Sequence, residues 1–522
     1  RGLGDVYKRQ ILCFGGLAMS VANICIIIAI VVYLAAMVIV GIVCSKKNNS
    51  VDDFYLGGRQ LGPLVTAMSA EASDMSGWLL MGMPGLAYLC GIAEASWTAI
   101  GLAIGTYLNW LIVAKRLRNY SSRIGAITIP DFFGKRFKDN THVLMFASAL
   151  LIIIFFIPYT ASGFSTCGKL FSSLFGLDYH VAVIVSAIVI VLYTTLGGFL
   201  AASTTDFIQA IIMTIALIAV LCFGIKTAGG WNAVAENAKS IPHYLSLTST
   251  TDGAGNMVPF GGSTIISTLA WGLGYFGMPH ILLRFMAIKD PNKIKTSRRV
   301  ASIWVVIAMS VAIIIGIVGL AMSKNESSMV LKDSETIIVA IAALLAKHGV
   351  FFALLAGLIL AGILASTMST ADSQLLAAAS AISQDLMVGS LRLKISEKVK
   401  MIAARATVIA IAVLGVVFAW NPDSSVFRIV SFAWAGFGAS FGPLMLFSLF
   451  WKRTNKWGAM AGMISGGITV IAWHYASGGI FSLYELLPAF IVSSLFIVVV
   501  SLLTKAPEQE IIDEFEAAKA DK

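Results

Sequence analysis

The chain has 522 residues, of which 58% are hydrophobic and 12% are charged, and its net charge is +10. Soluble proteins carry about twice that charged fraction, so the composition excludes an ordinary soluble enzyme. The six cysteines include no CxxC pair, and the sequence has no GxxxxGKS or GxxxxGKT phosphate-binding motif. These absences argue against a cysteine-based metal centre and against an ATP-driven pump.

Long apolar runs recur from one end of the chain to the other. Each is long enough to cross about 30 Å of hydrocarbon as a helix, and the runs are too continuous for barrel strands. We therefore predict an all-α polytopic membrane protein with thirteen transmembrane helices. The predicted spans are residues 23–44, 61–90, 95–114, 143–166, 181–202, 206–225, 262–283, 301–322, 350–386, 406–420, 425–451, 457–475 and 482–504.

Basic residues alternate between the predicted connections. Those after spans 1, 3, 7, 9, 11 and 13 contain 27 of the 37 lysines and arginines. Because such residues concentrate on the cytoplasmic side, the C-terminus is predicted to be cytoplasmic, and the odd number of spans then places the N-terminus outside. The basic excess is predicted to contact lipid headgroups of the cytoplasmic membrane. It indicates no nucleic-acid partner, and no feature indicates an obligate protein partner.

No Pro/Ser-rich linker divides the chain, so one integral membrane domain is predicted over residues 19–505. The first methionine is Met19, and residues 1–18 are predicted to be a non-native or disordered leader, with a short extracellular tail as the alternative. Residues 506–522 are predicted to form a cytoplasmic tail with an exposed charged helix. The segment AITIPDFFGKRF, residues 126–137, is predicted to lie on the membrane surface.

Two predicted spans are interrupted by small, polar or helix-breaking residues. Span 61–90 contains SAEASDMSGW, and span 262–283 contains WGLGYFGMP. Such interruptions free backbone groups at mid-bilayer, where only protein or a cavity can satisfy them. Two interrupted spans that lie five apart predict inverted repeats of five spans, at about 61–225 and 262–451. They indicate a transporter whose binding site lies near the bilayer midplane.

Asp74 lies in the middle of the first interrupted span. A charge at mid-bilayer costs about 3 kcal/mol and therefore suggests function. The span has no Lys or Arg to pair with it, whereas carbonyls freed between Ala72 and Met75 would suit a cation such as Na⁺, since hard cations take oxygen ligands. The alternative is a neutral, protonated Asp74 bound to a neighbouring helix. Glu71, one turn earlier, faces either the cavity or a neighbouring helix.

Hydroxyl groups gather in the ninth span. Ser366, Ser369 and Thr370 share one helical face, and Asp372 follows two residues later. They are candidate cation ligands, although hydroxyls in membrane helices commonly bond back to their own helix. Asp206, at the start of the sixth span, is predicted either to serve in capping that helix or to contact a cation at an inner gate.

Four aromatic residues near the interruptions are candidates for a solute site: Trp78, Tyr159, Trp271 and Tyr275. They would wall a compact amphipathic solute, and a half-helix N-terminus would receive its carboxylate. The alternative is ordinary packing or interfacial anchoring.

One sequence motif, GxSxG, also occurs in hydrolases and raises the question of an enzymatic function. Residues Gly438–Gly442 match GxSxG, which in hydrolases requires a strand–turn–helix context and a histidine partner. Here the motif lies inside an apolar span, where close helix packing explains both glycines. We therefore predict that the protein is not an enzyme.

Several longer strings resemble the sodium/solute symporter family: SAEASDMSGWLLMG, LGGRQLGP, GGFLAASTTDFIQA, WGLGYFGMPHILLRFMA and STMSTADSQLL. The resemblance runs from about Val21 to Pro507. It implies a thirteen-helix protein with a five-plus-five inverted-repeat core, like the leucine transporter. It also implies import of L-proline with one Na⁺ per substrate by alternating access, without an organic cofactor.

The resemblance also assigns roles to residues. Backbone oxygens and hydroxyls would bind Na⁺, with Asp74 essential to that binding; the set is Ala72, Asp74, Met75, Ser366, Ser369 and Thr370. Proline would lie near Ser76, Trp78, Gly82, Tyr159, Trp271, Tyr275 and Pro279. Arg59 and Asp206 would affect coupling or gating. Glu71 and Ser366 depart from the best-known bacterial proline carrier, which has Gly and Ala there.

Three rival functions remain open at this stage. Another solute of the same family, such as pantothenate, a sugar or a monocarboxylate, would keep the symport mechanism. A membrane sensor would require a signalling domain, and the short tail contains none. A channel would not accumulate solute against a gradient.

Overall fold

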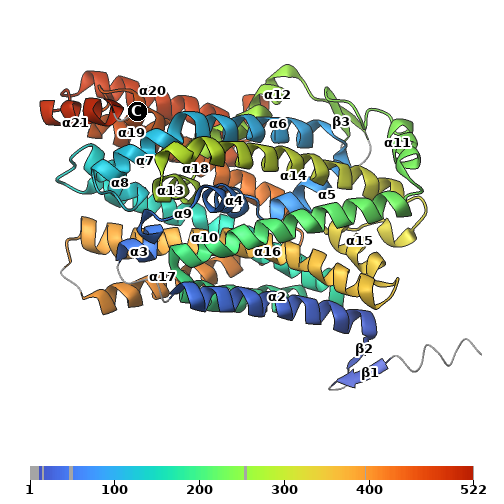
Figure 1. Ribbon diagram of the computed structural model, residues 1–522. Helices are drawn as coiled ribbons and strands as arrows, with labels where there is room; N and C mark the ends of the chain where they lie inside the picture. The colour runs from blue at the N-terminus through green and yellow to red at the C-terminus, as the bar shows by residue number, and fades with distance from the viewer. Residues whose placement is uncertain (1–10, 15–16, 46–50, 252–255, 394–395, 521–522) are drawn as a thin grey trace, which may run out of the picture.

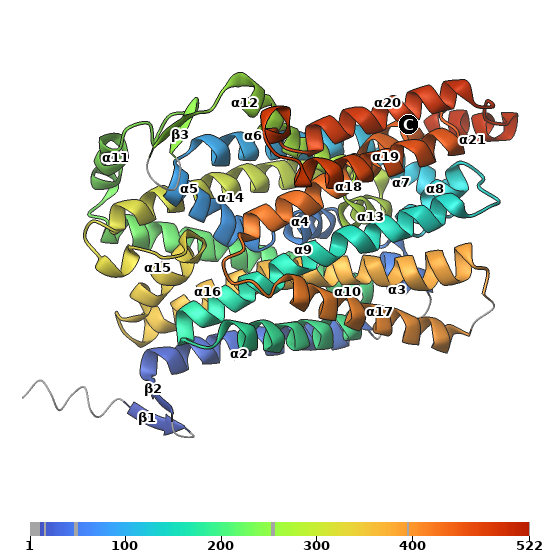
Figure 2. The same cartoon turned by 180° about the vertical axis from the view of Figure 1, so that it is seen from behind.

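The computed structural model describes residues 11–14, 17–45, 51–251, 256–393 and 396–520. Within them, nine helices are long and apolar enough to cross a membrane, and a bent helix pair makes a tenth. These helices lie side by side in one bundle (Figures 1 and 2). The protein is therefore a multi-pass membrane protein of the predicted all-α class.

Each predicted span contains helix. The first, α2, is Val21–Ser45. The predicted first repeat contains α4 (Pro63–Asp74), η2 (Trp78–Gly82), α5 (Met83–Cys90), α6 (Ala93–Leu108), η3 (Asn109–Val113), α7 (Ala114–Arg123), α9 (Val143–Phe175) and α10 (Tyr179–Thr227). The second comprises α12 (Gly262–Leu269), η4 (Ala270–Phe276), α13 (Pro279–Ala287), α14 (Ile294–Met322), α16 (Val350–Ser380), η8 (Ala381–Ser390), α17 (Glu397–Phe418) and α18 (Val426–Phe450). Helices α19 (Lys456–Tyr475) and α20 (Leu486–Leu503) follow. The count of thirteen crossings stays a prediction, because three of the predicted spans are short, interrupted or less apolar.

Short elements cover the two ends of the bundle. At one end lie α3 (Val51–Leu56), η1 (Gly57–Arg59), α8 (Ile129–Arg136), η5 (Pro291–Lys293) and α21 (Gln509–Ala520). At the other lie α11 (Trp231–Ser240), the hairpin of β3 (Ser249–Thr251) and β4 (Met257–Pro259), η6 (Ser327–Met329), η7 (Ser334–Thr336), α15 (Ile337–Ala346) and η9 (Gly479–Ser482). We call these the α21 end and the α11 end (Figure 1).

Most of the predicted leader lies outside the described residues. Of residues 1–18, the structure describes 11–14 and 17–18. A hairpin of β1 (Ile11–Phe14) and β2 (Leu17–Ser20) leads directly into α2. Strand β2 thus extends past Met19, the predicted start of the native chain. The origin of the leader stays a prediction.

The fifth and sixth predicted spans form the element α10, in which two helical segments meet at a sharp, non-helical kink at Gly198. Its φ of 72° is a conformation that a glycine adopts without steric cost. Asp206 therefore lies inside a helix and not at its start. The Thr204 and Thr205 hydroxyls donate to the carbonyls of Leu200 and Ala201, so the predicted capping role is wrong.

Two segments that we expected at the surface pack into the protein instead. Helix α8 begins with the Thr128 hydroxyl accepting a bond from the Asp131 N–H, and Phe132 and Phe133 are fully buried. Helix α21 buries Phe515, whose ring lies 5.0 Å from the Arg136 guanidinium carbon. The apolar side of each helix finds a protein partner, so neither needs a lipid surface.

Both predicted interruptions are present. Helix α4 stops at Asp74, and Met75 and Ser76 are not helical; Met75 has ψ of 71°. The chain then resumes as the π-helical turn η2 and α5. In the second repeat, the 3₁₀ segment η4 ends at Phe276, and Gly277 and Met278 connect it to α13 with a bend of 46°. We call Met75–Ser76 the first break and Gly277–Met278 the second break.

Candidate ion and solute site

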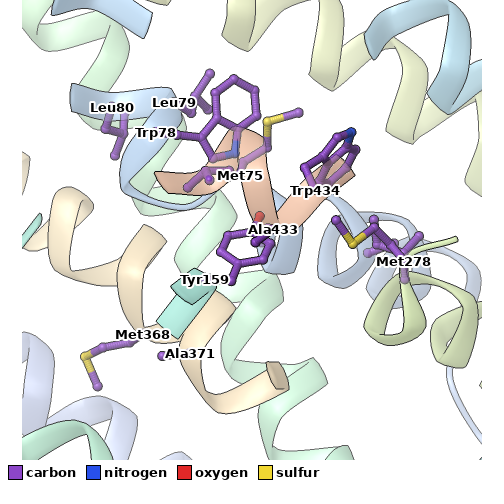
Figure 3. Close-up of a cluster of buried hydrophobic side chains, with 14 of the residues drawn as sticks. Met75, Trp78, Leu79, Leu80, Tyr159, Met278, Met368, Ala371, Ala433 and Trp434 are labelled. Atoms are coloured by element: carbon purple, nitrogen blue, oxygen red, sulfur yellow. The ribbon is translucent and has the colours of Figure 1, made fainter. Parts of the chain in front are cut away.

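The carbonyl groups that the first break frees are bound by side chains of other elements. The Ala72 carbonyl accepts a hydrogen bond of 2.8 Å from the Ser369 hydroxyl of α16. The Asp74 carbonyl accepts from the Trp78 indole at 3.0 Å and from the Tyr159 hydroxyl at 3.2 Å. Figure 3 shows Met75, Trp78 and Tyr159 around this break, with Trp434 beside them. The break is thus satisfied by protein, as a non-helical segment inside a membrane must be.

The hydroxyl groups of α16 lie against the first break. Ser369 reaches across to Ala72 and also donates to the Ser366 carbonyl at 3.1 Å. Thr370 donates to the same carbonyl at 3.0 Å, whereas the Ser366 hydroxyl bonds back to Ile363. A hydroxyl that donates keeps its lone pairs for a cation. The structure therefore brings together the Ala72 and Ser366 carbonyls and the Ser369 and Thr370 hydroxyls.

The Asp74 carboxylate faces a different side. Its Oδ2 accepts a hydrogen bond of 2.7 Å from the Tyr275 hydroxyl of η4, and its Oδ1 has no hydrogen-bond partner. Met75, by contrast, keeps its N–H on the Glu71 carbonyl at 2.8 Å. Asp74 is fully buried between the two broken spans. Its placement links the ion candidates of α4 to the second break.

The predicted aromatic residues meet, and further aromatic residues join them. The Trp271 ring lies 6.3 Å from Trp78, and Tyr275 lies 5.0 Å from Trp434. The Trp434 indole also donates to the Trp271 carbonyl at 2.8 Å. Sequence reasoning missed three partners of this cluster, and no periodicity distinguished them from packing residues. They are Phe427, Trp434 and Tyr484, at centroid distances of 5.2, 6.3 and 5.1 Å from Trp271.

The other predicted solute residues lie at the edges of this cluster. Ser76 is in the first break, and its buried hydroxyl has no partner. Gly82 lies against Phe427, since a Cβ there would be 3.1 Å from the Phe427 Cβ. Pro279 is the first residue of α13, at a half-helix N-terminus. All seven predicted residues are therefore found around the two breaks.

A buried ion pair joins four elements beside the breaks. Arg284 of α13 lies 3.0 Å from the Asp206 carboxylate of α10 and donates to the Ser69 hydroxyl of α4 at 3.0 Å. It also donates to Ser373 of α16, which in turn donates to Asp372 at 3.3 Å. We call these residues the Arg284 cluster. Sequence reasoning counted Arg284 only as a connection charge, because nothing in the sequence indicated its partner.

Arg59 forms a separate contact. Its guanidinium donates to the Met286 carbonyl at 2.8 Å and to the Ala126 carbonyl at 2.6 Å. It thus connects η1 with the end of α13 and with the segment before α8. Among the described residues, no hydrogen bond or ion pair is found between Arg59 and Asp206.

A second ion cluster lies near the α11 end. Lys169 of α9 is 2.7 Å from the Glu335 carboxylate and 2.8 Å from Asp333. Glu335 also accepts from the Ser425 hydroxyl at 2.8 Å and from the Val426 N–H at 3.0 Å, at the start of α18. We call this the Lys169 cluster. It lines a hollow of about 400 Å³ whose wall includes Gly82 and Phe427, so the hollow lies next to the aromatic cluster.

The GxSxG motif has no hydrolase geometry. All five residues are inside helix α18, and the buried Ser440 hydroxyl has no hydrogen-bond partner among the described residues. A Cβ on Gly438 would lie 2.8 Å from the Gly274 Cα, and one on Gly442 would lie 2.8 Å from the Phe490 ring. The glycines are explained by close helix packing.

Comparison with known proteins decides the family. The model of the sodium:solute symporter family matches residues 54–466. The chain belongs to the sodium:solute symporter family. It is 44% identical over 92% of its length to the high-affinity proline transporter PutP of Bacillus subtilis, of which 98% is covered. It is 43% identical over 94% of its length to the sodium/proline symporter of Salmonella typhimurium, of which 95% is covered.

Two solved transporter structures share the fold at low sequence identity. A Na⁺-coupled sialic acid symporter in a substrate-bound outward-open state superposes with a TM-score of 0.75 at 18% identity, covering 93% of this chain and 99% of that one. A nucleobase-cation-symport-1 family transporter in a closed conformation gives 0.54 at 14% identity, covering 89% and 98%. The predicted family and the predicted leucine-transporter-like fold class of this symporter are both confirmed.

Proposed function

We propose that this protein is a secondary active symporter that imports L-proline across the cytoplasmic membrane together with Na⁺. The observation that carries the proposal is the meeting of the two breaks, with neutral oxygen atoms on one side and a buried aromatic cluster on the other. The relatives named as proline transporters support the choice of solute. No covalent chemistry is needed, so the protein is proposed to be a transporter and not an enzyme.

For Na⁺, we propose the predicted set of Ala72, Asp74, Met75, Ser366, Ser369 and Thr370. The Ser369 hydroxyl already lies 2.8 Å from the Ala72 carbonyl, so a cation between α4 and α16 would take ligands from both helices. Asp74 would act indirectly, because its carboxylate is bound to Tyr275 of η4. A cation at this position would hold α4 against α16 and leave the first break open to a solute.

For proline, we propose the space between the breaks, with Ser76, Trp78, Gly82, Tyr159, Trp271, Tyr275 and Pro279 around it. The rings supply apolar area for a pyrrolidine ring, and the N-terminus of α13 favours a carboxylate. The unpartnered Ser76 hydroxyl is available to a polar group of the solute. The proposal extends to Phe427 and Trp434, which complete the aromatic wall.

Alternating access would use the two ion clusters in turn. We propose that the α21 end is cytoplasmic and the α11 end extracellular, with the N-terminus outside, as the alternation of basic connections predicts. The Lys169 cluster would then open for entry and the Arg284 cluster, with Arg59 as a gating residue, for release. Each Na⁺ that crosses a membrane potential of 100 mV contributes about 2.3 kcal/mol. This free energy drives transport because the two conformational states of the protein bind Na⁺ and solute with different affinities.

The domain organisation follows from the same proposal. Residues 19–505 would form one integral domain with repeats at about 61–225 and 262–451, and residues 506–522 would be a cytoplasmic tail. In the structure the tail helix α21 packs on the bundle, so we propose that it is a docked part of the domain.

The test is uptake of radiolabelled L-proline into proteoliposomes with and without an inward Na⁺ gradient. The native protein is expected to need Na⁺. Asp74→Asn is expected to lose at least about 100-fold of that uptake, a change of about 2.7 kcal/mol. Asp513→Asn, a carboxylate change in α21, is the matched control. Sodium-dependent uptake that Asp74→Asn retains would remove Asp74 from the mechanism. No proline uptake would favour another solute of the family.

A further inference from the structure

Glu71 and Asp74 form a second polar face of α4, away from the carbonyl and hydroxyl ligands of the proposed Na⁺ site, in which Asp74 acts only indirectly. The two carboxylates are three residues apart, and so lie on one side of the helix, and both are at most 1% exposed. That side faces η3 and η4, whereas the Ala72 carbonyl faces α16. Neither carboxylate makes an ion pair with any described residue. Two buried acids therefore lack a positive partner.

Each carboxylate has one oxygen fixed by a neighbour and one free. Glu71 Oε1 accepts a hydrogen bond of 3.1 Å from the Trp110 indole, and Asp74 Oδ2 accepts one of 2.7 Å from the Tyr275 hydroxyl. Glu71 Oε2 and Asp74 Oδ1 are buried without a hydrogen-bond partner. The two fixed bonds orient the carboxylates, so their free oxygens are held in place in the absence of any ligand.

The opposing element presents further free oxygens. Thr106, Asn109 and Trp110 lie on one face of α6 and η3, by their spacing of three and four residues. Asn109 donates from its amide nitrogen to the Tyr275 carbonyl at 2.9 Å, which leaves its buried Oδ1 without a partner. The buried Thr106 hydroxyl is also without a partner. Asn109 begins the π-helical turn η3, a deformation that is frequent at functional sites.

These atoms have the chemistry of a cation site. Hard monovalent and divalent cations take carboxylate, amide and hydroxyl oxygens. Four unpartnered oxygens exceed what a shared proton needs, because a proton between two carboxylates uses only two. Charge balance favours a monovalent ion, since the proposed Na⁺ site has only neutral ligands apart from Asp74. Two carboxylates then balance two Na⁺ ions across the first break.

We propose that Glu71, Asp74, Thr106 and Asn109 bind a second Na⁺ between α4 and α6, and that both ions are transported with each solute. The inference rests on the proposed Na⁺-coupled import of proline. Tyr275 joins this site to the second break through its hydroxyl and its carbonyl. Filling the site would therefore also fix η4, which carries the aromatic wall of the solute site.

The experiment measures the flux of ²²Na⁺ and of ³H-proline into the same proteoliposomes. The native protein is expected to carry about two Na⁺ per proline, because each site contributes one ion, and Glu71→Gln about one. Glu94→Gln is the matched control: it lies on α6 about 18 Å before the site, at 1.5 Å per residue, and should keep the native ratio.

Other outcomes overturn the inference in recognisable ways. A native ratio of one Na⁺ per proline rejects the second site while the symporter stands, and an accompanying proton, read with a pH dye, assigns the carboxylates to H⁺ instead. A native protein without Na⁺-dependent proline uptake rejects the proposed function itself. If Glu71→Gln does not transport, equilibrium binding of ²²Na⁺ to the purified proteins decides: the inference requires one bound ion fewer than in the native protein.

Discussion

The two broken spans have similar interruptions but opposite charges. The first brings two carboxylates, Glu71 and Asp74, each with a free buried oxygen. The second brings Arg284, which donates to Asp206, Ser69, Ser373 and the His280 carbonyl. The first break is therefore under-coordinated, which is why we propose that it accepts cations, whereas the second is fixed by the bonds of Arg284. Two helix breaks at corresponding positions can therefore serve different tasks when their side chains differ.

Arg284→Gln tests how firmly the second break is fixed and has the largest expected effect. Removing one partner of a buried ion pair costs about 3–5 kcal/mol, because Asp206 is left without a counter-charge. We expect a large fall in the melting temperature of the purified protein. Arg428→Gln, at an exposed position of α18, is the control.

The double variant Arg284→Gln/Asp206→Asn sharpens the same test. Removing both charges is expected to restore much of the lost stability, because no buried charge is then unpaired. If the double variant loses as much stability as the two single variants together, the unpaired buried charge is not the cause of the instability.

Gly277→Ala tests whether the second break needs close backbone contact. A Cβ at this position would lie 2.3 Å from the Phe437 carbonyl oxygen of α18, and backbone cannot move aside easily. Overpacking of this kind costs about 1–3 kcal/mol. We expect reduced yield of folded protein in size-exclusion chromatography and a lower melting temperature. Gly262→Ala in α12 has no atom within 4 Å of the new Cβ and should behave as the native protein.

Ser369→Ala tests the first break. The variant loses the bond to the Ala72 carbonyl and a hydroxyl of the proposed Na⁺ site. The Na⁺ concentration for half-maximal proline uptake is expected to rise about tenfold, equal to about 1.4 kcal/mol. Ser380→Ala removes a hydroxyl of the same helix that bonds back to the Ala377 carbonyl, and should leave Na⁺ affinity unchanged. Equal Na⁺ affinities in the two variants would contradict the assignment.

Asp139 is a carboxylate far from both breaks, and the variant Asp139→Asn therefore serves as a comparison. Burial alone would raise the pKa of Asp139, but bonds from the Thr141 hydroxyl and from the Leu144 and Thr141 N–H groups lower it. A lowered pKa stabilises the fold above the unfolded pKa of about 3.9, and this stabilisation is lost as pH falls through the folded value.

We therefore expect Asp139→Asn to lower stability by about 1–2 kcal/mol at neutral pH, and the difference in melting temperature from the native protein to shrink progressively as the pH falls below about 4. The Na⁺ affinity of uptake should not change. A changed Na⁺ affinity would mean that carboxylates outside the breaks also set ion binding, which would weaken the comparison.

The class of protein and the location of both breaks could be predicted from the amino-acid sequence. Apolar runs need a bilayer, and Gly-rich or polar interruptions inside them need protein partners, so SAEASDMSGW and WGLGYFGMP could be found without coordinates. The ordered motifs also determined the family. The surface placement of α8 and α21 was wrong, because an amphipathic sequence has the same pattern whether lipid or protein covers its apolar side.

The partners of the polar groups could not be predicted before the helices were placed in space. Periodicity placed Glu71 and Asp74 on one helical face, but not against Trp110 and Tyr275. It gave no signal that Arg284 pairs with Asp206, 78 residues away. The physical reason is that hydrogen bonds and ion pairs form between elements that packing brings together, whereas sequence patterns report only the faces of single helices. The proposed ion and solute sites of this symporter require the faces of several helices to meet.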